Sequence, residues 1–292
     1  MKVIIQIPCY NEEVSLPHTL RDLPRTLPGI DAVEWLVIDD GSTDRTSEVA
    51  ERLGVDHLVR HRQNLGLAQA FMTGLNACVE RGADIIINTD ADNQYCAGDM
   101  PRLIDPILKG TAEIVVGARP IMTIRHFSLL KKLLQAIGSW AVRKVSNTSV
   151  SDAPSGFRAI SRNAAMKLNV FNRYTYTLET IIQAGRKEIQ IVSVPIRTNS
   201  FLRPSRLVKS LGNYVYRSMA TTVRIFMIYR PFRFFMFVGA VPFAAGIVIW
   251  LRFLWYYLIL GHATGKVQSL ILASLLMGFG FLLFILALLA DL

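Results

Sequence analysis

The chain has 292 residues, of which 51% are hydrophobic and 18% are charged, and its formal net charge is +10. It is long enough for one large domain or two, and it is more apolar and less charged than a typical soluble protein. No nucleic-acid-binding motif accompanies the positive charge, so we expect no nucleic acid partner.

Short apolar runs alternate with helical patterns through about the first 120 residues. Buried strands are predicted at residues 3–8, 35–39, 57–61, 85–89 and 114–118. Helices are predicted between them, at residues 14–23, 43–53, 67–81 and 101–108. Apolar strands that alternate with helices favour an α/β fold with a mostly parallel sheet covered on both faces.

Polar clusters follow three of these strands, at residues 8–13, 39–44 and 89–94. Ligands of such sheets bind beyond the carboxyl ends of the strands, so we expect the three clusters to share one edge. Asp90 and Asp92 offer carboxylates one residue apart, which suits Mg²⁺ or Mn²⁺ bound together with substrate phosphates. A solvated turn is the alternative interpretation of an isolated Asp-x-Asp.

The cluster at residues 39–44 has a structural explanation for only part of its sequence. Gly41 permits a tight turn, and Ser42 or Thr43 can cap the next helix. Asp39 and Asp40 keep no such role, and a carboxylate there can accept hydrogen bonds from a ribose or a base. The chain has no Walker-type loop, so the negative charge of a bound phosphate has to be neutralised by a metal ion and basic side chains.

Two long segments, residues 114–151 and 189–290, contain no acidic residue. Within them, residues 121–145 and 205–229 alternate apolar and basic positions at helical spacing. This pattern is typical of amphipathic helices that lie on anionic membrane headgroups. Packing of ordinary surface helices against the sheet is the alternative interpretation.

Two apolar stretches near the C-terminus, residues 234–260 and 267–290, are each long enough to cross a hydrocarbon core of ~30 Å. They predict a transmembrane hairpin, and two buried core helices are the alternative. Arginines precede the first stretch, whereas the turn carries only Lys266, so the positive-inside rule places the N-terminal domain and both termini in the cytoplasm. We therefore predict a two-span protein of the inner membrane, and such a hairpin could pack against copies of itself as a homo-oligomer.

Four motifs resemble those of family 2 glycosyltransferases, in the same order. They are Pro-Cys-Tyr-Asn-Glu-Glu at residues 8–13, Asp-Asp-Gly-Ser-Thr-Asp at 39–44, Arg-Gln-Asn-Leu-Gly at 62–66 and Asp-Ala-Asp at 90–92. Val-Gly-Ala-Arg at 116–119 and Ser-Asp-Ala-Pro-Ser-Gly-Phe-Arg at 151–158 resemble the polyprenyl-phosphate branch, which includes dolichol-phosphate mannosyltransferase and bacterial undecaprenyl-phosphate glycosyltransferases. The resemblance runs from residue 1 to about residue 230 and implies a glycosyltransferase A-type, Rossmann-like fold.

The resemblance also implies roles for individual residues. The nucleotide pocket would be lined by Pro8, Tyr10, Asn11, Glu12, Asp39, Asp40 and Asp90. Asp90, Asp92 and Gln94 would hold Mg²⁺ or Mn²⁺ against the diphosphate. By the same resemblance, the catalytic residues would be Asp90, Asp92, Arg119 and Arg158. The residues that bind the acceptor phosphate would be Arg119, Lys131, Lys132, Arg158, Arg203 and Arg206.

The expected reaction is an inverting transfer of a sugar from a UDP- or GDP-sugar to undecaprenyl or dolichyl phosphate at the cytoplasmic leaflet. The expected parts are a catalytic domain (residues 1–200), a basic loop with juxtamembrane helices (201–232) and the hairpin (233–292). One alternative is a family 2 enzyme with a glycolipid or polysaccharide acceptor. Processive polysaccharide synthases usually carry Gln-x-x-Arg-Trp, and here Lys187 follows Arg186. The other alternative is a catalytically inactive membrane scaffold, which should have lost an acidic or basic site residue.

Overall fold

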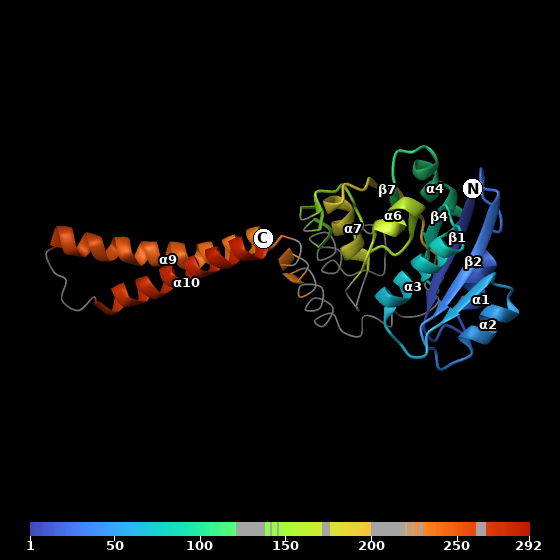
Figure 1. Ribbon diagram of the computed structural model, residues 1–292, viewed down its shortest axis with the longest axis horizontal. Coiled ribbons are helices and arrows are strands. Elements are labelled where there is room, and N and C mark those ends of the chain that lie inside the picture. The colour runs from blue at the N-terminus through green and yellow to red at the C-terminus, as the bar shows by residue number, and fades with distance from the viewer. Residues whose placement is uncertain are drawn as a thin grey trace. The chain divides into compact units, whose positions relative to one another are not determined.

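The computed structural model describes residues 1–120, 138–140, 142–144, 146–170, 176–199, 220, 223–224, 226–227, 230–260 and 267–292. The chain divides into two compact units, Met1–Ser218 and Met219–Leu292 (Figure 1). Most of the predicted middle region, residues 201–232, lies outside the described residues. The division into three parts therefore stays a prediction.

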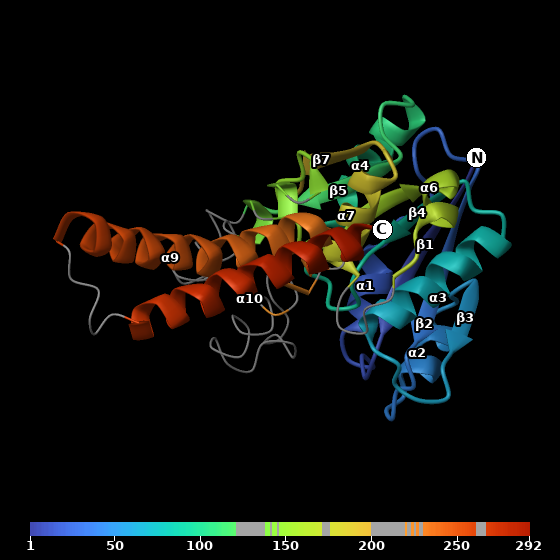
Figure 2. The ribbon, with the colours of Figure 1, turned by 60° about the vertical axis from the view of Figure 1, so that its left-hand side comes forward.

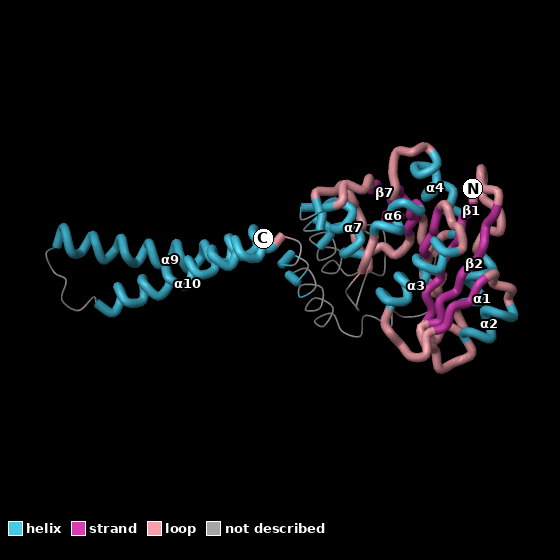
Figure 3. The backbone as a smooth tube through the Cα atoms, viewed as in Figure 1, coloured by secondary structure: helices cyan, strands magenta, loops and turns pink. Residues whose placement is uncertain are grey.

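The first unit is built on a seven-stranded sheet with the order β3-β2-β1-β4-β6-β5-β7 (Figure 3). The strands are β1 (Lys2–Cys9), β2 (Ala32–Asp39), β3 (His57–Arg60), β4 (Ile85–Asn88), β5 (Ile114–Ala118), β6 (Arg158–Ser161) and β7 (Ile191–Pro195). Every pairing is parallel except the two made by β6, which runs antiparallel between β4 and β5. The predicted mostly parallel sheet is confirmed.

Helices cover both faces of this sheet. On one face, α1 (Leu16–Asp22), α2 (Thr46–Arg52) and α4 (Met100–Leu108) contribute Leu20, Val49 and Leu103 to a core with the inward side chains of β1, β2 and β4. On the other face, α3 (Leu67–Glu80) contacts β1, β2 and α6 (Arg162–Lys167) (Figure 2). The remaining helices of this unit are the short 3₁₀ helix η1 (Ala97–Asp99) and α7 (Thr177–Arg186).

The register of the central strands fixes the position of the site. Cys9 at the end of β1 pairs with Asp39 on β2, and Gln6 pairs with Asn88 on β4. The loops after β1, β2 and β4 therefore leave the same edge of the sheet, and the three polar clusters share that edge as the sequence predicts. Because β6 is antiparallel, its first residue, Arg158, pairs with Asn88 at the same edge.

The second unit contains two long helices, α9 (Pro231–Leu260) and α10 (Val267–Asp291), which pack against each other. Small residues allow the close approach, because a Cβ added at Gly280 would lie 2.7 Å from the Cβ of Phe243. Residues Pro231–Leu258 and Val267–Asp291 are long and apolar enough to cross a membrane. By length and composition, this confirms the two predicted candidate spans, and their orientation stays a prediction.

Candidate active site

The loops after β1 and β2 are bonded to each other. Asn11 adopts a positive φ of 55°, and its side-chain oxygen accepts the backbone N–H of Thr43 at 2.8 Å. In return, the N–H of Asn11 donates to the hydroxyl of Ser42 at 2.9 Å, and that of Glu12 donates to the hydroxyl of Thr46 at 2.8 Å. Asn11 and Glu12, both predicted to bind nucleotide, therefore also hold the two loops together.

Asp39 is fully buried at the end of β2. Its Oδ1 accepts the N–H of Ser42 at 2.8 Å, and its Oδ2 accepts the hydroxyl of Ser47. The Nε of Arg60, the strand partner of Asp39, lies 3.5 Å from Oδ2, while the Arg60 side chain remains 59% exposed. Arg60 was not predicted as a site residue, because only the β2–β3 register brings it to Asp39.

Asp40 organises the loop between β3 and α3. Its carboxylate shares a 2.7 Å hydrogen bond with the Nδ1 of His61 and accepts the N–H groups of Leu65 and Gly66, both at 2.9 Å. Asp40 is 3% exposed, so burial makes these three bonds costly to lose. The structure thus gives Asp40 a positioning role in this loop, and its predicted contact with nucleotide stays a prediction.

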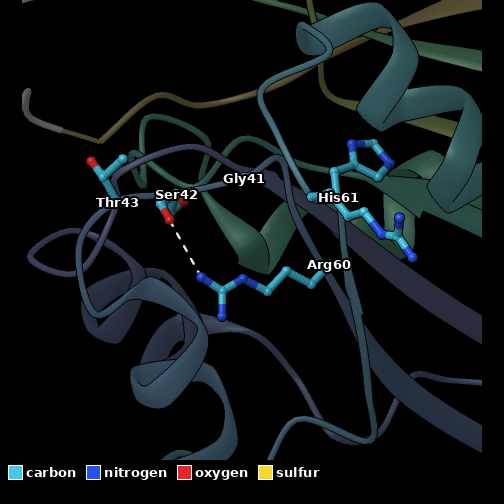
Figure 4. A pocket seen from close by; sticks show the side chains of 6 residues that line it. Gly41, Ser42, Thr43, Arg60 and His61 are labelled. Carbon is cyan, nitrogen blue, oxygen red and sulfur yellow. Dashed lines mark hydrogen bonds between the residues drawn. The ribbon is translucent and has the colours of Figure 1, made fainter.

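A cavity of about 470 Å³ lies beside these two loops, lined by Gly41, Ser42, Thr43, Arg60, His61 and Arg62. Figure 4 shows Arg60 extending toward Ser42, whose carbonyl oxygen lies 3.5 Å from its Nη2. Gly41 has a φ of +70°, and a Cβ there would lie 2.4 Å from the backbone of Gln63, so only glycine fits. Two arginines in the lining suit a ligand with hydrogen-bond acceptors or negative charge.

Neighbouring groups hold the acidic stretch in place. The hydroxyl of Thr19 on α1 donates to the carbonyl of Ala91 at 2.8 Å, which fixes the backbone between the two aspartates. Gln94 donates its side-chain amide to the Oδ2 of Asp92 at 2.7 Å. Burial, and then the charge of Asp92, raise the pKa of Asp90 to about 7. The site therefore brings two carboxylates close enough to repel each other.

A chain of buried polar groups lies behind Asp90. Gln6 donates to the side-chain oxygen of Asn88 at 2.8 Å, and Asn88 donates to the carbonyl of Gly156 and the hydroxyl of Tyr176, both at 2.8 Å. A Cβ added at Gly156 would lie 2.9 Å from the Oδ1 of Asp90 and 2.9 Å from the Tyr176 hydroxyl. Glycine at position 156 therefore lets the segment before β6 approach Asp90.

The two predicted catalytic arginines occupy different environments. Arg119, after β5, makes a bidentate ion pair with Asp152, and this partner helps to raise its pKa even though burial opposes the charge. Arg158 is fully buried, and its guanidinium donates to the carbonyls of Ser155, Ala153 and Thr177 at 2.9 Å each. These contacts favour a structural role for Arg158 in shaping residues 153–158, and its predicted contact with a phosphate stays a prediction.

Four predicted acceptor-side residues, Lys131, Lys132, Arg203 and Arg206, lie outside the described residues. So do most residues of the predicted amphipathic helices at 121–145 and 205–229. The segment before the basic loop is described, and it is bonded to the acidic stretch. The N–H of Asn199 donates to the carbonyl of Gln94 at 2.9 Å, and Arg197 pairs with Asp99 at 2.9 Å.

The donor set at the acidic stretch fits a divalent cation shared with a substrate. Among the described residues, no group of three or more His, Cys, Asp or Glu side chains could hold a metal ion alone. Mg²⁺ is usually bound by one or two carboxylates together with substrate phosphates, so such a protein cage is not required. Asp90 and Asp92 supply two carboxylates, and the repulsion between them would be relieved by a cation.

Comparison with known proteins agrees with this arrangement. The model of the family described as "Glycosyl transferase family 2" matches residues 4–174. A UDP-N-acetylglucosamine–dolichyl-phosphate N-acetylglucosaminyltransferase of Methanococcus voltae is 30% identical over 218 residues, covering 67% of this chain and 85% of the relative. An undecaprenyl-phosphate mannosyltransferase of Micrococcus luteus is 30% identical over 206 residues, covering 67% of this chain and 83% of the relative.

Solved structures show the same fold. Glucosyl-3-phosphoglycerate synthase from Mycobacterium tuberculosis, crystallised with Mn²⁺, UDP and glucosyl-3-phosphoglycerate, superposes with a TM-score of 0.61 at 21% identity, covering 77% of this chain and 79% of that one. The predicted glycosyltransferase A-type fold is thereby confirmed. The two named relatives confirm the predicted resemblance to the polyprenyl-phosphate branch.

Proposed function

The chain belongs to glycosyl transferase family 2, and we propose that it transfers a sugar from a nucleoside diphosphate to a polyprenyl phosphate at the cytoplasmic face of a membrane. The observation that carries the proposal is the shared sheet edge, at which the Asp39 pocket and the acidic stretch lie on either side of the end of β1. The two named relatives act on dolichyl and undecaprenyl phosphate, which supports this class of acceptor.

The donor half of the site comes from the first three parallel strands. The cavity lined by Arg60 and Arg62 would take the nucleoside, with the buried Asp39 beside it as a hydrogen-bond acceptor. Pro8 near the end of β1, with Tyr10, Asn11 and Glu12 just after it, would line the path of the diphosphate between this cavity and Asp90. A UDP- or GDP-sugar is the proposed donor.

Asp90 and Asp92, with Gln94 beside them, would hold Mg²⁺ or Mn²⁺. When bound, the cation neutralises the negative charge that builds on the departing diphosphate. Gln94 donates to Asp92 and so fixes the orientation of that carboxylate. Arg119 is held in place by its ion pair with Asp152, and it would place a fixed positive charge where the phosphates gather.

The acceptor chemistry needs no dedicated base. A phosphate monoester has a second pKa of about 6, so its oxygen is already ionised near neutral pH. The protein then has to orient this oxygen rather than deprotonate it, unlike the case of a hydroxyl acceptor. Attack from the face opposite the diphosphate would invert the anomeric carbon. Lys131, Lys132, Arg203 and Arg206 are the proposed contacts of the acceptor phosphate.

The second unit supports a membrane setting. Two helices of sufficient length and apolarity would anchor the enzyme where its lipid substrate resides. The arginines just before and at the start of α9, including Arg230 and Arg233, favour the cytoplasmic side for the catalytic unit and for both termini. Anionic headgroups would attract the basic segments next to the spans.

A transfer assay with the full chain in detergent tests the proposal. Labelled UDP- and GDP-sugars are incubated with undecaprenyl phosphate and Mn²⁺, and label that moves into the lipid phase is counted. We expect transfer by the wild type, none by Asp92→Asn, and wild-type transfer by the control Asp105→Asn, whose side chain is exposed on α4. Undiminished transfer by Asp92→Asn would exclude the metal role, and a chain that binds neither nucleotide is not this enzyme.

A further inference from the structure

Asn199 binds the loop that follows Asp92 at three successive backbone carbonyls. Its backbone N–H donates to the carbonyl of Gln94 at 2.9 Å. Its side-chain amide donates to the carbonyl of Asn93 at 3.1 Å and to that of Tyr95 at 3.2 Å. A side-chain amide nitrogen carries two N–H groups, so one donor is available for each of these two carbonyls. Asn199 therefore holds the backbone on both sides of Gln94.

The loop has a backbone conformation that needs such support. Asn93 adopts a φ of 56°, in the left-handed region that residues other than glycine adopt uncommonly. Its side chain donates to the Oδ2 of Asp22 at 2.8 Å, and the amide nitrogen of Asn199 lies 3.4 Å from its side-chain oxygen. A conformation of this kind persists when the surrounding structure fixes it. Asn199 supplies part of that structure from a distant position in the sequence.

Gln94 transmits the position of this loop to Asp92. The backbone N–H of Gln94 donates to the Oδ1 of Asp92 at 3.2 Å, and its side-chain amide donates to Oδ2 at 2.7 Å. Both oxygens of the carboxylate therefore accept a hydrogen bond from one residue. A shift of the Gln94 backbone would move both donors together, and the orientation of Asp92 would change with them.

Asn199 belongs to a segment that is itself anchored. The backbone N–H of Arg197 donates to the Oδ2 of Asp99 at 2.6 Å, and its guanidinium pairs with the same carboxylate at 2.9 Å. The Asp99 side chain is 1% exposed, so this anchor is largely shielded from water. Thr198 forms a β-bridge with Tyr95. The segment after β7 can therefore hold the loop in one position.

We propose that Asn199 is a positioning residue of the cation site, which acts through Gln94 to orient the Asp92 carboxylate for a divalent ion. This inference rests on the proposed metal role of Asp90 and Asp92. Replacing residues that orient metal ligands by hydrogen bonds typically changes metal affinity by about 10–100-fold. A residue that only joined two segments would affect stability and leave the affinity for the ion unchanged.

The variant Asn199→Leu keeps the size of the side chain and the backbone N–H but removes both amide donors. Asn199→Ala removes the same donors with less bulk, so the two variants should agree. Arg25→Met is the matched control. Arg25 also donates to a loop carbonyl, that of Gly54 at 2.6 Å, but this loop leads into β3 at the opposite edge of the sheet.

The test measures Mn²⁺ binding to the full chain in detergent by calorimetry, with UDP or GDP present. Asn199→Leu and Asn199→Ala should each weaken Mn²⁺ binding about tenfold, whereas Arg25→Met should bind Mn²⁺ like the wild type. The rise in Tm on adding Mn²⁺ is a second readout, which should shrink only in the Asn199 variants.

A double-mutant cycle with Gln94→Ala tests the route through Gln94. If Asn199 acts through this residue, Asn199→Leu should weaken Mn²⁺ binding far less in a chain that already carries Gln94→Ala than in the wild type. Losses that simply add would contradict the proposed route.

Two further results would overturn the inference. One is wild-type Mn²⁺ affinity in the Asn199 variants, and the other is an equal loss in Arg25→Met, which indicates general damage to the fold. These results, like additive losses in the cycle, leave the proposed function intact. A wild-type chain that binds no Mn²⁺ with either nucleotide would instead overturn the metal role and this inference with it, so the two failures are distinguishable.

Discussion

Arg119 and Asp152 form a bidentate ion pair, with the Nε of Arg119 2.7 Å from Oδ2 and its Nη2 3.0 Å from Oδ1. The backbone N–H of Arg119 donates to the same carboxylate at 3.1 Å. The Asp152 side chain is 1% exposed and that of Arg119 is 14% exposed, so water screens the pair weakly. The pair joins the end of β5 to the segment before β6 and so links two motifs more than thirty residues apart.

Replacing Asp152 should destabilise the protein strongly. Asp152→Ala leaves the Arg119 charge nearly buried without its partner, which typically costs about 3 kcal/mol. The Tm of the full chain should fall by roughly 6–12 °C. The control Asp105→Ala removes the partner of Lys109 in a pair exposed on both sides, and its Tm should stay close to that of the wild type. Similar Tm values for the two variants would contradict this assignment.

A methyl group at position 156 should disturb the acidic stretch. In Gly156→Ala the new Cβ would lie 2.9 Å from the Oδ1 of Asp90, so one of the two must move, at a typical cost of about 1–3 kcal/mol. We expect a lower Tm and at least tenfold weaker Mn²⁺ binding. Gly138→Ala is the control, because no atom lies within 4 Å of a Cβ added there. Normal Mn²⁺ binding by Gly156→Ala would contradict this prediction, because it would show that the segment before β6 can shift away from Asp90.

Binding of the cation should depend on pH near neutrality. The pKa of Asp90 is raised to about 7, mainly by burial and then by the charge of Asp92. Below pH 7 the carboxyl holds a proton that the cation must displace, so affinity should fall by up to tenfold for each unit of decreasing pH. Above pH 8 affinity should level off. Calorimetric Mn²⁺ titrations between pH 5.5 and 8.5 measure this, and a flat profile would contradict it.

The same pKa has a consequence for folding. The carboxyl binds its proton more tightly in the folded chain than in the unfolded one, so the metal-free fold is favoured at low pH and loses this contribution as pH rises through about 7. The site is therefore under electrostatic strain at neutral pH, which a bound cation would relieve.

Arg60 should affect donor binding more than metal binding. It lines the 470 Å³ cavity and its Nε lies 3.5 Å from Asp39, on the far side of β1 from the acidic stretch. Arg60→Gln removes a charged donor, and losing one charged hydrogen bond of about 1.5 kcal/mol corresponds to roughly tenfold weaker nucleotide binding. Isothermal titration with UDP and GDP measures the loss. Wild-type nucleotide affinity in this variant would place the nucleoside elsewhere.

The helical hairpin should depend on the small residues between its helices. Gly280→Leu would place side-chain atoms where Phe243 now lies, since even a Cβ would come within 2.7 Å of it. We expect a lower Tm in detergent. No atom lies within 4 Å of a Cβ added at Gly278, two residues away, so Gly278→Leu should have the Tm of the wild type. If the two variants have equal Tm values, the contact between α9 and α10 is not what stabilises this unit.

The sequence predicts most of the parallel strands because they are buried on both faces. Such strands are continuous apolar runs, as in the three isoleucines that begin β4, and β5 begins and ends where predicted. Strand β6 was missed, since Arg158–Ser161 is short and begins with an arginine. Its strand character depends on pairing with β4 and β5, which are distant in sequence. Strand β7 was missed as well and is likewise held by a distant partner, β5.

The site was predictable in position but not in detail. The predicted ends of the strands place Asp39, Asp90 and Asp92 at one edge of the sheet, because the loops that follow parallel strands leave the same edge. The sequence could not show that Arg158 is buried, since its guanidinium bonds to the carbonyl of Thr177, at the start of α7, as well as to carbonyls just before its own strand.

The reversed direction of β6 separates the two halves of the site along the chain. The groups proposed for the nucleotide end with β4, whereas the segment at residues 151–158 arrives at the same edge from the opposite direction. The polar groups at this edge therefore come from two separate stretches of the chain, and the contacts of Asn88 and Asp90 with Gly156 join the two.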